Sequence, residues 1–154
     1  MSTSLQNPLA LLGRALLALL FIPAGVSKLT GFAGTVGYIA SKGVPLPELA
    51  AAVGVGVELG LGLLVLVGFQ TRWAALGMAV FTLVISCIFH DFWGVPVEQV
   101  MAQSQQFFKN MAIVGGLLTV AAWGAGAWSV DAARGISRLK YFIRYFFNLT
   151  GVIS

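Results

Sequence analysis

Long apolar runs with few charges decide what this chain can fold into. Of its 154 residues, 58% are hydrophobic and 9% are charged, and the mean hydropathy is +0.92. A soluble domain carries about 25% charged residues, and a chain with far fewer has too few polar groups to cover its surface. The sequence therefore excludes a soluble globule and a disordered segment, and it indicates a protein surrounded by membrane lipid.

Four of the apolar runs are long enough to cross a membrane as helices, which need about 20 residues each. They cover approximately residues 8–26, 49–69, 71–90 and 107–128. Thr71 is typical of a helix N-cap, so the second and third runs are expected to form a tight helical hairpin. We predict an all-α membrane protein in which residues 1–131 form a four-transmembrane-helix bundle. Two loops, at about 27–48 and 91–106, connect the helices at one end.

The distribution of positive charges predicts the orientation of this bundle. An even number of spans places both termini on one side, together with Arg72 and the basic C-terminal residues. The other side carries Lys28, Lys42 and Lys109. The positive-inside rule therefore predicts a multi-pass protein with both termini in the cytoplasm.

Residues 132–154 form a basic, amphipathic C-terminal tail. Its apolar residues share one helical face, whereas Arg138, Lys140 and Arg144 lie on the other. We expect an interfacial helix whose basic face meets anionic lipid, because a fifth span would bury three cations. Four of the nine basic residues lie between Arg134 and Arg144, so the net charge of +4 does not indicate nucleic-acid binding.

Two charged residues fall inside the apolar runs, where an unpaired charge costs several kcal/mol. Glu58 has Gly54 and Gly62 four residues away on either side, and small neighbours allow another helix to approach closely. Glu58 is therefore expected to point into the bundle. Arg14 lies about two turns into the first span. One interpretation is a buried Arg14–Glu58 pair that fixes the helix register, and the other adds ligand binding or proton transfer by this pair.

A second polar group is predicted at the opposite ends of the helices. Thr82, Ser86 and His90 follow one another at four-residue spacing, and His90 with Asp91 would form an imidazole–carboxylate unit for proton transfer. Around this unit, two cations, an amide and four aromatic side chains are expected, namely Lys28, Lys109, Asn110, Phe92, Trp93, Phe107 and Phe108. Aromatic walls with a few donors suit a planar ligand with two carbonyls, such as a quinone. The alternative is an interfacial aromatic belt with snorkelling lysines.

The chain has one cysteine, Cys87, and one histidine, so an internal disulfide, a CxxC pair and a multi-histidine metal or haem centre are excluded. We predict no metal site and no intrinsic cofactor. Redox chemistry would need a diffusible cofactor, such as a quinone, or a partner redox protein.

Several motifs, in order along residues 11–131, resemble the DoxX family. They are GVSKLTGF at 25–32, GVP at 43–45, Glu58, GFQTR at 68–72, HDFW at 90–93, QFFKN at 106–110 and GGLL at 115–118. The resemblance implies a small bacterial inner-membrane protein with a four-helix bundle, in a family linked to quinone-dependent oxidation and to oxidative-stress complexes. The positions that it implies for a site are Arg14, Lys28, Glu58, His90, Trp93, Lys109 and Asn110.

Two functions remain open at this point. The first is a membrane oxidoreductase component that binds a quinone or a similar planar amphiphile and acts with partner redox proteins. In it, His90, Asp91 and Glu58 are the candidate catalytic residues. The candidate ligand contacts are Arg14, Lys28, Trp93, Phe107, Lys109 and Asn110. The second is a non-enzymatic scaffold or assembly factor whose buried charges are structural and whose small-residue faces pack on a partner or a second copy. A transporter ranks last, because four helices enclose little pathway unless the protein oligomerises.

Overall fold

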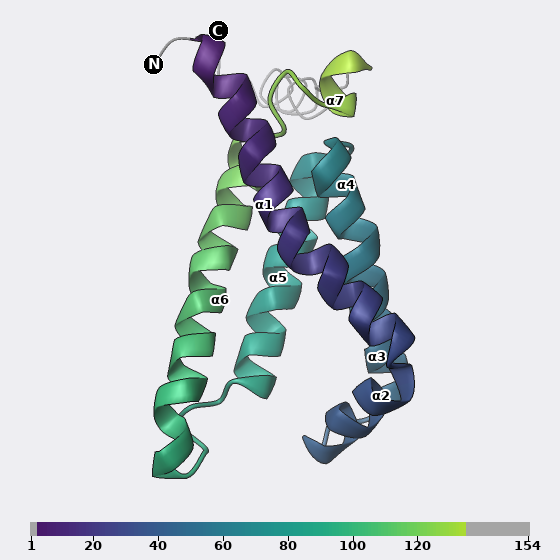
Figure 1. The fold of residues 1–154 in the computed structure, drawn as a ribbon, viewed down its shortest axis with the longest axis vertical. Coiled ribbons are helices and arrows are strands. Elements are labelled where there is room, and N and C mark those ends of the chain that lie inside the picture. Colours follow the sequence, from purple (N-terminus) through teal and green to yellow (C-terminus); the bar gives the residue numbers. More distant parts are fainter. Residues whose placement is uncertain (1–2, 135–154) are drawn as a thin grey trace, which may run out of the picture.

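The computed structural model describes residues 3–134, and this part of the chain is helical without strands. Four long helical segments dominate Figure 1: α1 (Thr3–Thr30), the continuous series α3 (Pro47–Gly56), η1 (Val57–Leu61) and α4 (Gly62–Val67), then α5 (Thr71–Phe89) and α6 (Val97–Trp123). Two short helices, α2 (Phe32–Ser41) and α7 (Val130–Ala133), complete the described part. The predicted interfacial helix of the tail lies outside the described residues.

Three of the long segments, Leu5–Thr30, Pro47–Val67 and Thr71–Phe89, are long and apolar enough to cross a membrane. Helix α6 is longer than any of these except α1, but its first half is rich in polar residues. It begins at Val97, ten residues before the predicted start of the fourth run. The apolar pattern marks the lipid-facing part of a helix, whereas glutamine, methionine and alanine extend the helix beyond it.

Both predicted loops are therefore partly helical. Residues 27–48 contain the end of α1 and the whole of α2, and residues 91–106 contain the first turns of α6. Helix α1 also begins at Thr3, five residues before the predicted start of the first span at residue 8.

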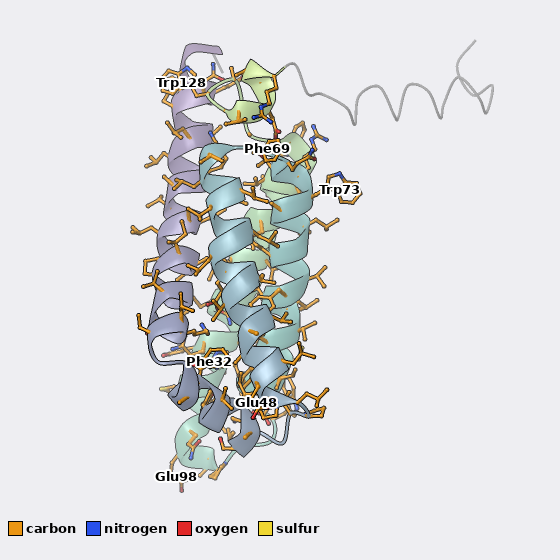
Figure 2. All side chains as sticks on the ribbon, turned by 90° about the vertical axis from the view of Figure 1, so that its right-hand side faces the viewer. Phe32, Glu48, Phe69, Trp73, Glu98 and Trp128 are labelled. Atoms are coloured by element: carbon orange, nitrogen blue, oxygen red, sulfur yellow. The ribbon has the colours of Figure 1, made fainter. Side chains whose placement is uncertain are left out.

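The molecule has two distinct ends. The start of α1, the α4–α5 turn and α7 lie at one end, which we call the α7 end (Figure 1). Helix α2 and the α5–α6 connection lie at the other, the α2 end. In Figure 2, the labelled Phe69, Trp73 and Trp128 mark the α7 end, and Phe32, Glu48 and Glu98 mark the α2 end.

Small residues allow the helices to pack closely. The buried face of the second long segment presents Gly54, Glu58 and Gly62, as the sequence predicted. A Cβ on Gly25 of α1 would lie 2.8 Å from Cγ of Leu59 and 3.1 Å from Cβ of Glu58. At this crossing, the backbone of α1 therefore lies very close to the side chains of the second segment. The core beside this crossing contains Phe21, Val65, Ala74, Ala75, Met78, Ala79 and Leu117.

We expect Gly25→Ala to destabilise the protein by about 1–3 kcal/mol, because its Cβ would overpack the α1–η1 crossing. The matched control is Gly56→Ala, whose Cβ meets nothing within 4 Å. Thermal unfolding in mild detergent measures both variants. Equal midpoints for the two would contradict the close crossing.

Candidate functional site

The buried Glu58 carboxylate is paired with Lys28 of α1. Nζ of Lys28 lies 2.8 Å from each of the two carboxylate oxygens. The Glu58 side chain is 4% exposed and that of Lys28 is 35% exposed, so the pair reaches from the helix interface toward the surface. Glu58 lies in the π-helical turn η1, a local irregularity that is frequent at functional sites. Burial of Glu58 in the bundle is confirmed, with Lys28 as its partner.

The predicted Arg14–Glu58 pair is wrong. Antiparallel packing places Lys28 beside Glu58 and Arg14 beside Val65, so the two sites on the second segment are separated by seven residues, or roughly 10 Å along the axis. Arg14 and Lys28 are fourteen residues, or roughly 21 Å, apart on α1, so only one of them can lie opposite Glu58.

Arg14 instead caps the end of α4. It is 1% exposed, and its Nη1 donates to the carbonyl oxygens of Val65 at 3.2 Å and Leu66 at 2.9 Å. Its Nη2 donates to the carbonyl oxygen of Trp128. The last carbonyls of a helix have no partner within it, and a cation at that position is also favoured by the helix dipole. A single guanidinium therefore joins α1, α4 and the segment after α6.

Asp131 closes the same end of the molecule, a role that the sequence reasoning missed. Its carboxylate accepts hydrogen bonds from the backbone N–H groups of Gln70 (2.8 Å) and Thr71 (3.0 Å) and from the Thr71 hydroxyl (2.9 Å). Its own N–H donates to the carbonyl oxygen of Gly68 at 2.8 Å. Asp131 thus caps α5, and the predicted N-cap role of Thr71 is wrong because Gln70, with a φ of 48°, holds that position.

Gly68 lies next to both Arg14 and Asp131. Its φ of +73° is in the left-handed region, and a Cβ there would lie 2.5 Å from both Nη1 of Arg14 and Cβ of Ser129. The GFQTR motif at 68–72 is therefore explained structurally: Gly68 gives room for Arg14, and Gln70 and Thr71 donate to Asp131. The sequence signal that could have revealed this cap was the tight turn with its polar donors.

Near the α2 end, the polar residues that were predicted to meet at one site make separate contacts instead. Nδ1 of His90 lies 3.0 Å from Oε1 of Gln103, while Asp91 lies 3.8 Å from Nζ of Lys42. His90 and Asp91 therefore do not form the predicted imidazole–carboxylate unit. Lys28, predicted to join them, binds Glu58. Gln103 was missed because residues 91–106 were predicted to be a loop.

Asn110 reaches across the α5–α6 interface. Its Nδ2 donates to Oγ of Ser86 at 2.9 Å, and Oγ of Ser86 donates to the carbonyl oxygen of Thr82. Ser86 and Thr82 are fully buried. The stripe on α5 therefore faces α6, and Asn110 links the two helices. Lys109, the next residue back, is exposed.

Four aromatic side chains form a single cluster beside His90, which confirms that they gather as the sequence indicated. The ring centroids of Phe92 lie 5.0 Å from Trp93, 5.5 Å from Phe107 and 5.8 Å from Phe108. Trp93 and Phe107 lie 5.6 Å apart with an interplanar angle of 81°. Trp93 is 62% exposed and Phe108 is 61% exposed, so two rings of this aromatic cluster present free faces.

Comparison with known proteins agrees with this architecture. The family model described as DoxX matches residues 9–91, which run from α1 to just past the end of α5. The protein belongs to the DoxX family. Among its relatives, inner membrane protein YphA of Escherichia coli K12 is 39% identical over 123 residues, covering 80% of this chain and 88% of the relative. Inner membrane protein YqjF of the same organism is 41% identical over 127 residues, covering 82% and 92%.

These relatives show that this DoxX protein is a membrane protein of the inner-membrane type. A more distant similarity, 33% identity over 75 residues, links it to a Surfeit locus protein 4 homolog of Schizosaccharomyces pombe, of which it covers 25%. No solved structure matches the chain. Among residues 3–134, no group of three His, Cys, Asp or Glu side chains is placed to hold a metal ion.

We expect Asp131→Ala to destabilise this DoxX protein by about 1–2 kcal/mol, because the N-terminal donors of α5 lose their cap. Asp131→Asn, which retains an acceptor oxygen, is expected to lose less. Glu98→Ala is the control, since Glu98 is an exposed acid in the first turn of α6. Thermal unfolding and amide hydrogen exchange at residues 70–71 provide the readouts. Unchanged exchange in Asp131→Ala would contradict the cap.

Proposed function

We propose that this DoxX-family protein is a four-span membrane oxidoreductase component that binds a quinone or a similar planar amphiphile. The observation that supports this proposal is the aromatic cluster of Phe92, Trp93, Phe107 and Phe108 beside His90. A quinone ring stacks on exposed aromatic faces, and its two carbonyls need only a few polar partners. The isoprenoid or alkyl tail would extend into the surrounding lipid.

His90 supplies a suitable proton acceptor at this cluster. With Nδ1–H of His90 donating to the amide oxygen of Gln103, Nε2 would be the nitrogen that accepts a proton. A quinol hydroxyl would donate to Nε2, and an imidazolium would return the proton to a quinone oxygen. Lys109, exposed one residue after Phe108, would contact the second oxygen.

Electrons would pass to or from a partner redox protein, because the sequence holds a single cysteine and a single histidine. The Lys28–Glu58 pair and Arg14 are assigned structural roles in this proposal. Asp91 would help to position His90, because its ion pair with Lys42 joins the residue after His90 to the end of α2.

Mass spectrometry of small molecules that co-purify in mild detergent tests this proposal. We expect quinone to be enriched over bulk membrane lipid in the wild type and reduced about tenfold in Trp93→Ala, the loss expected when one well-packed aromatic contact of about 1.5 kcal/mol is removed. His90→Phe is expected to retain an aromatic ring but to lower the quinone content, because the hydrogen bond from Nε2 to the quinol is lost. Trp73→Ala is the matched control, because Trp73 is 63% exposed at the α7 end. Equal quinone content in all four proteins would overturn the proposal.

A scaffold for other membrane proteins is the second candidate, and one observation favours it. Every buried charge in the described residues is engaged within the chain, while Gly56 and Gly60 face outward with open space around them. Such GxxxG steps allow another helix to pack closely. Gly60→Leu would then abolish co-purification of a partner that Trp93→Ala retains. Loss of quinone from Trp93→Ala, with the partner retained in Gly60→Leu, would favour the quinone proposal.

A further inference from the structure

A groove opens between α1 and α6 toward the α7 end. The aromatic cluster lies near the opposite end of the molecule. It has a volume of about 570 Å³ and an almost entirely apolar lining. On α1 the lining runs from Leu9 to Leu20, and on α6 from Ile113 to Gly124. Glycines widen it: a Cβ on Gly13 would meet nothing within 4 Å, and one on Gly116 would only reach Leu17 at 4.0 Å.

The length of the groove matches one leaflet of a bilayer. Leu9 and Leu20 are eleven residues apart on α1, which corresponds to roughly 16 Å of helix. Half of the hydrocarbon core of a bilayer is about 15 Å thick. A lipid chain entering from the α7 side therefore fills the groove from end to end, whereas a transmembrane helix would extend well beyond it.

A cation stands at the headgroup end of this groove. The guanidinium of Arg72 lies against Gly124. A Cβ added to Gly124 would lie 3.3 Å from Nε of Arg72. Trp123, also in the lining, is 82% exposed, as is typical of an indole at the level of lipid headgroups. Among the described residues, Arg72 has neither an ion pair nor a side-chain hydrogen bond. The charged residues of this end in residues 3–134 are Arg14, Arg72, Arg134 and Asp131, so its net charge is positive.

We propose that the α1–α6 groove is a binding site for one anionic phospholipid. An acyl chain lies along Gly13 and Gly116, and the headgroup phosphate binds Arg72 beside Trp123. A basic group at the mouth of an interhelical crevice is the arrangement that retains acidic headgroups. The occupant is held by this protein independently of any quinone at the α2 end.

Native mass spectrometry of the delipidated full-length protein, titrated with phosphatidylglycerol or phosphatidylcholine, tests this site. We expect one phosphatidylglycerol molecule to bind more tightly than phosphatidylcholine. Gly116→Leu is expected to weaken it about tenfold, because the leucine side chain occupies the space of the acyl chain and removes its van der Waals contacts with α1 and α6. Gly115→Leu is the matched control, since Gly115 lies outside the groove lining and its Cβ meets nothing within 4 Å.

Arg72→Gln separates the headgroup contact from the acyl contact. It is expected to weaken phosphatidylglycerol about fivefold and to remove the preference over phosphatidylcholine. Gly13→Leu fills the groove from the opposite wall and gives a second test should Gly116→Leu misfold. Equal binding in Gly115→Leu and both groove-filling variants would overturn the proposal, as would a dimer that Gly116→Leu dissociates, because the occupant would then be a second copy.

Discussion

A charged group in the hydrocarbon part of a membrane needs a partner within the protein, and two such requirements set the position of α1. Near the α2 end, Lys28 of α1 neutralises Glu58 with both carboxylate oxygens at 2.8 Å. Toward the α7 end, Arg14 of the same helix binds the terminal carbonyls of α4. A helix fixed at two points to one neighbour can neither rotate nor slide without leaving a charge unpaired, at a cost of several kcal/mol. Gly25 allows the approach that these contacts require.

The sequence predicted the helical class, the approximate spans and the inward direction of Glu58, because hydropathy and small-residue spacing are local signals. It did not predict the partner of Glu58, because α1 carries two cations, Arg14 and Lys28, and which of them lies opposite Glu58 depends on how the two helices are shifted along their axes. It also missed Asp131 and Gln103, whose partners are 60 and 13 positions away in the chain, because no local pattern reports contacts across such separations. The aromatic cluster was predictable because residues 92–93 follow one span and residues 107–108 begin the next, and the connected ends of successive spans lie on the same side of a membrane.

The two ends of the molecule have different character. At the α7 end, Arg14, Gly68 and Asp131 connect α1, the α4–α5 turn and the segment after α6 through satisfied polar contacts. At the α2 end, Trp93 and Phe108 present open aromatic faces next to a histidine. In the proposed function, the exposed aromatic rings of the α2 end receive the ligand, and the polar contacts of the α7 end hold the helices together. The π-helical turn at Glu58 lies between the two ends and directs the carboxylate toward α1.

A double-mutant cycle on Lys28 and Glu58 tests most directly whether this ion pair positions α1. Unfolding free energies in detergent would be compared for Lys28→Met, Glu58→Gln and the double variant. We expect Lys28→Met alone to cost about 3–5 kcal/mol, because it leaves a buried carboxylate unpaired, and the double variant to recover much of that loss. Additive effects of the two substitutions, with no coupling between them, would contradict the pairing and with it the assigned register of α1.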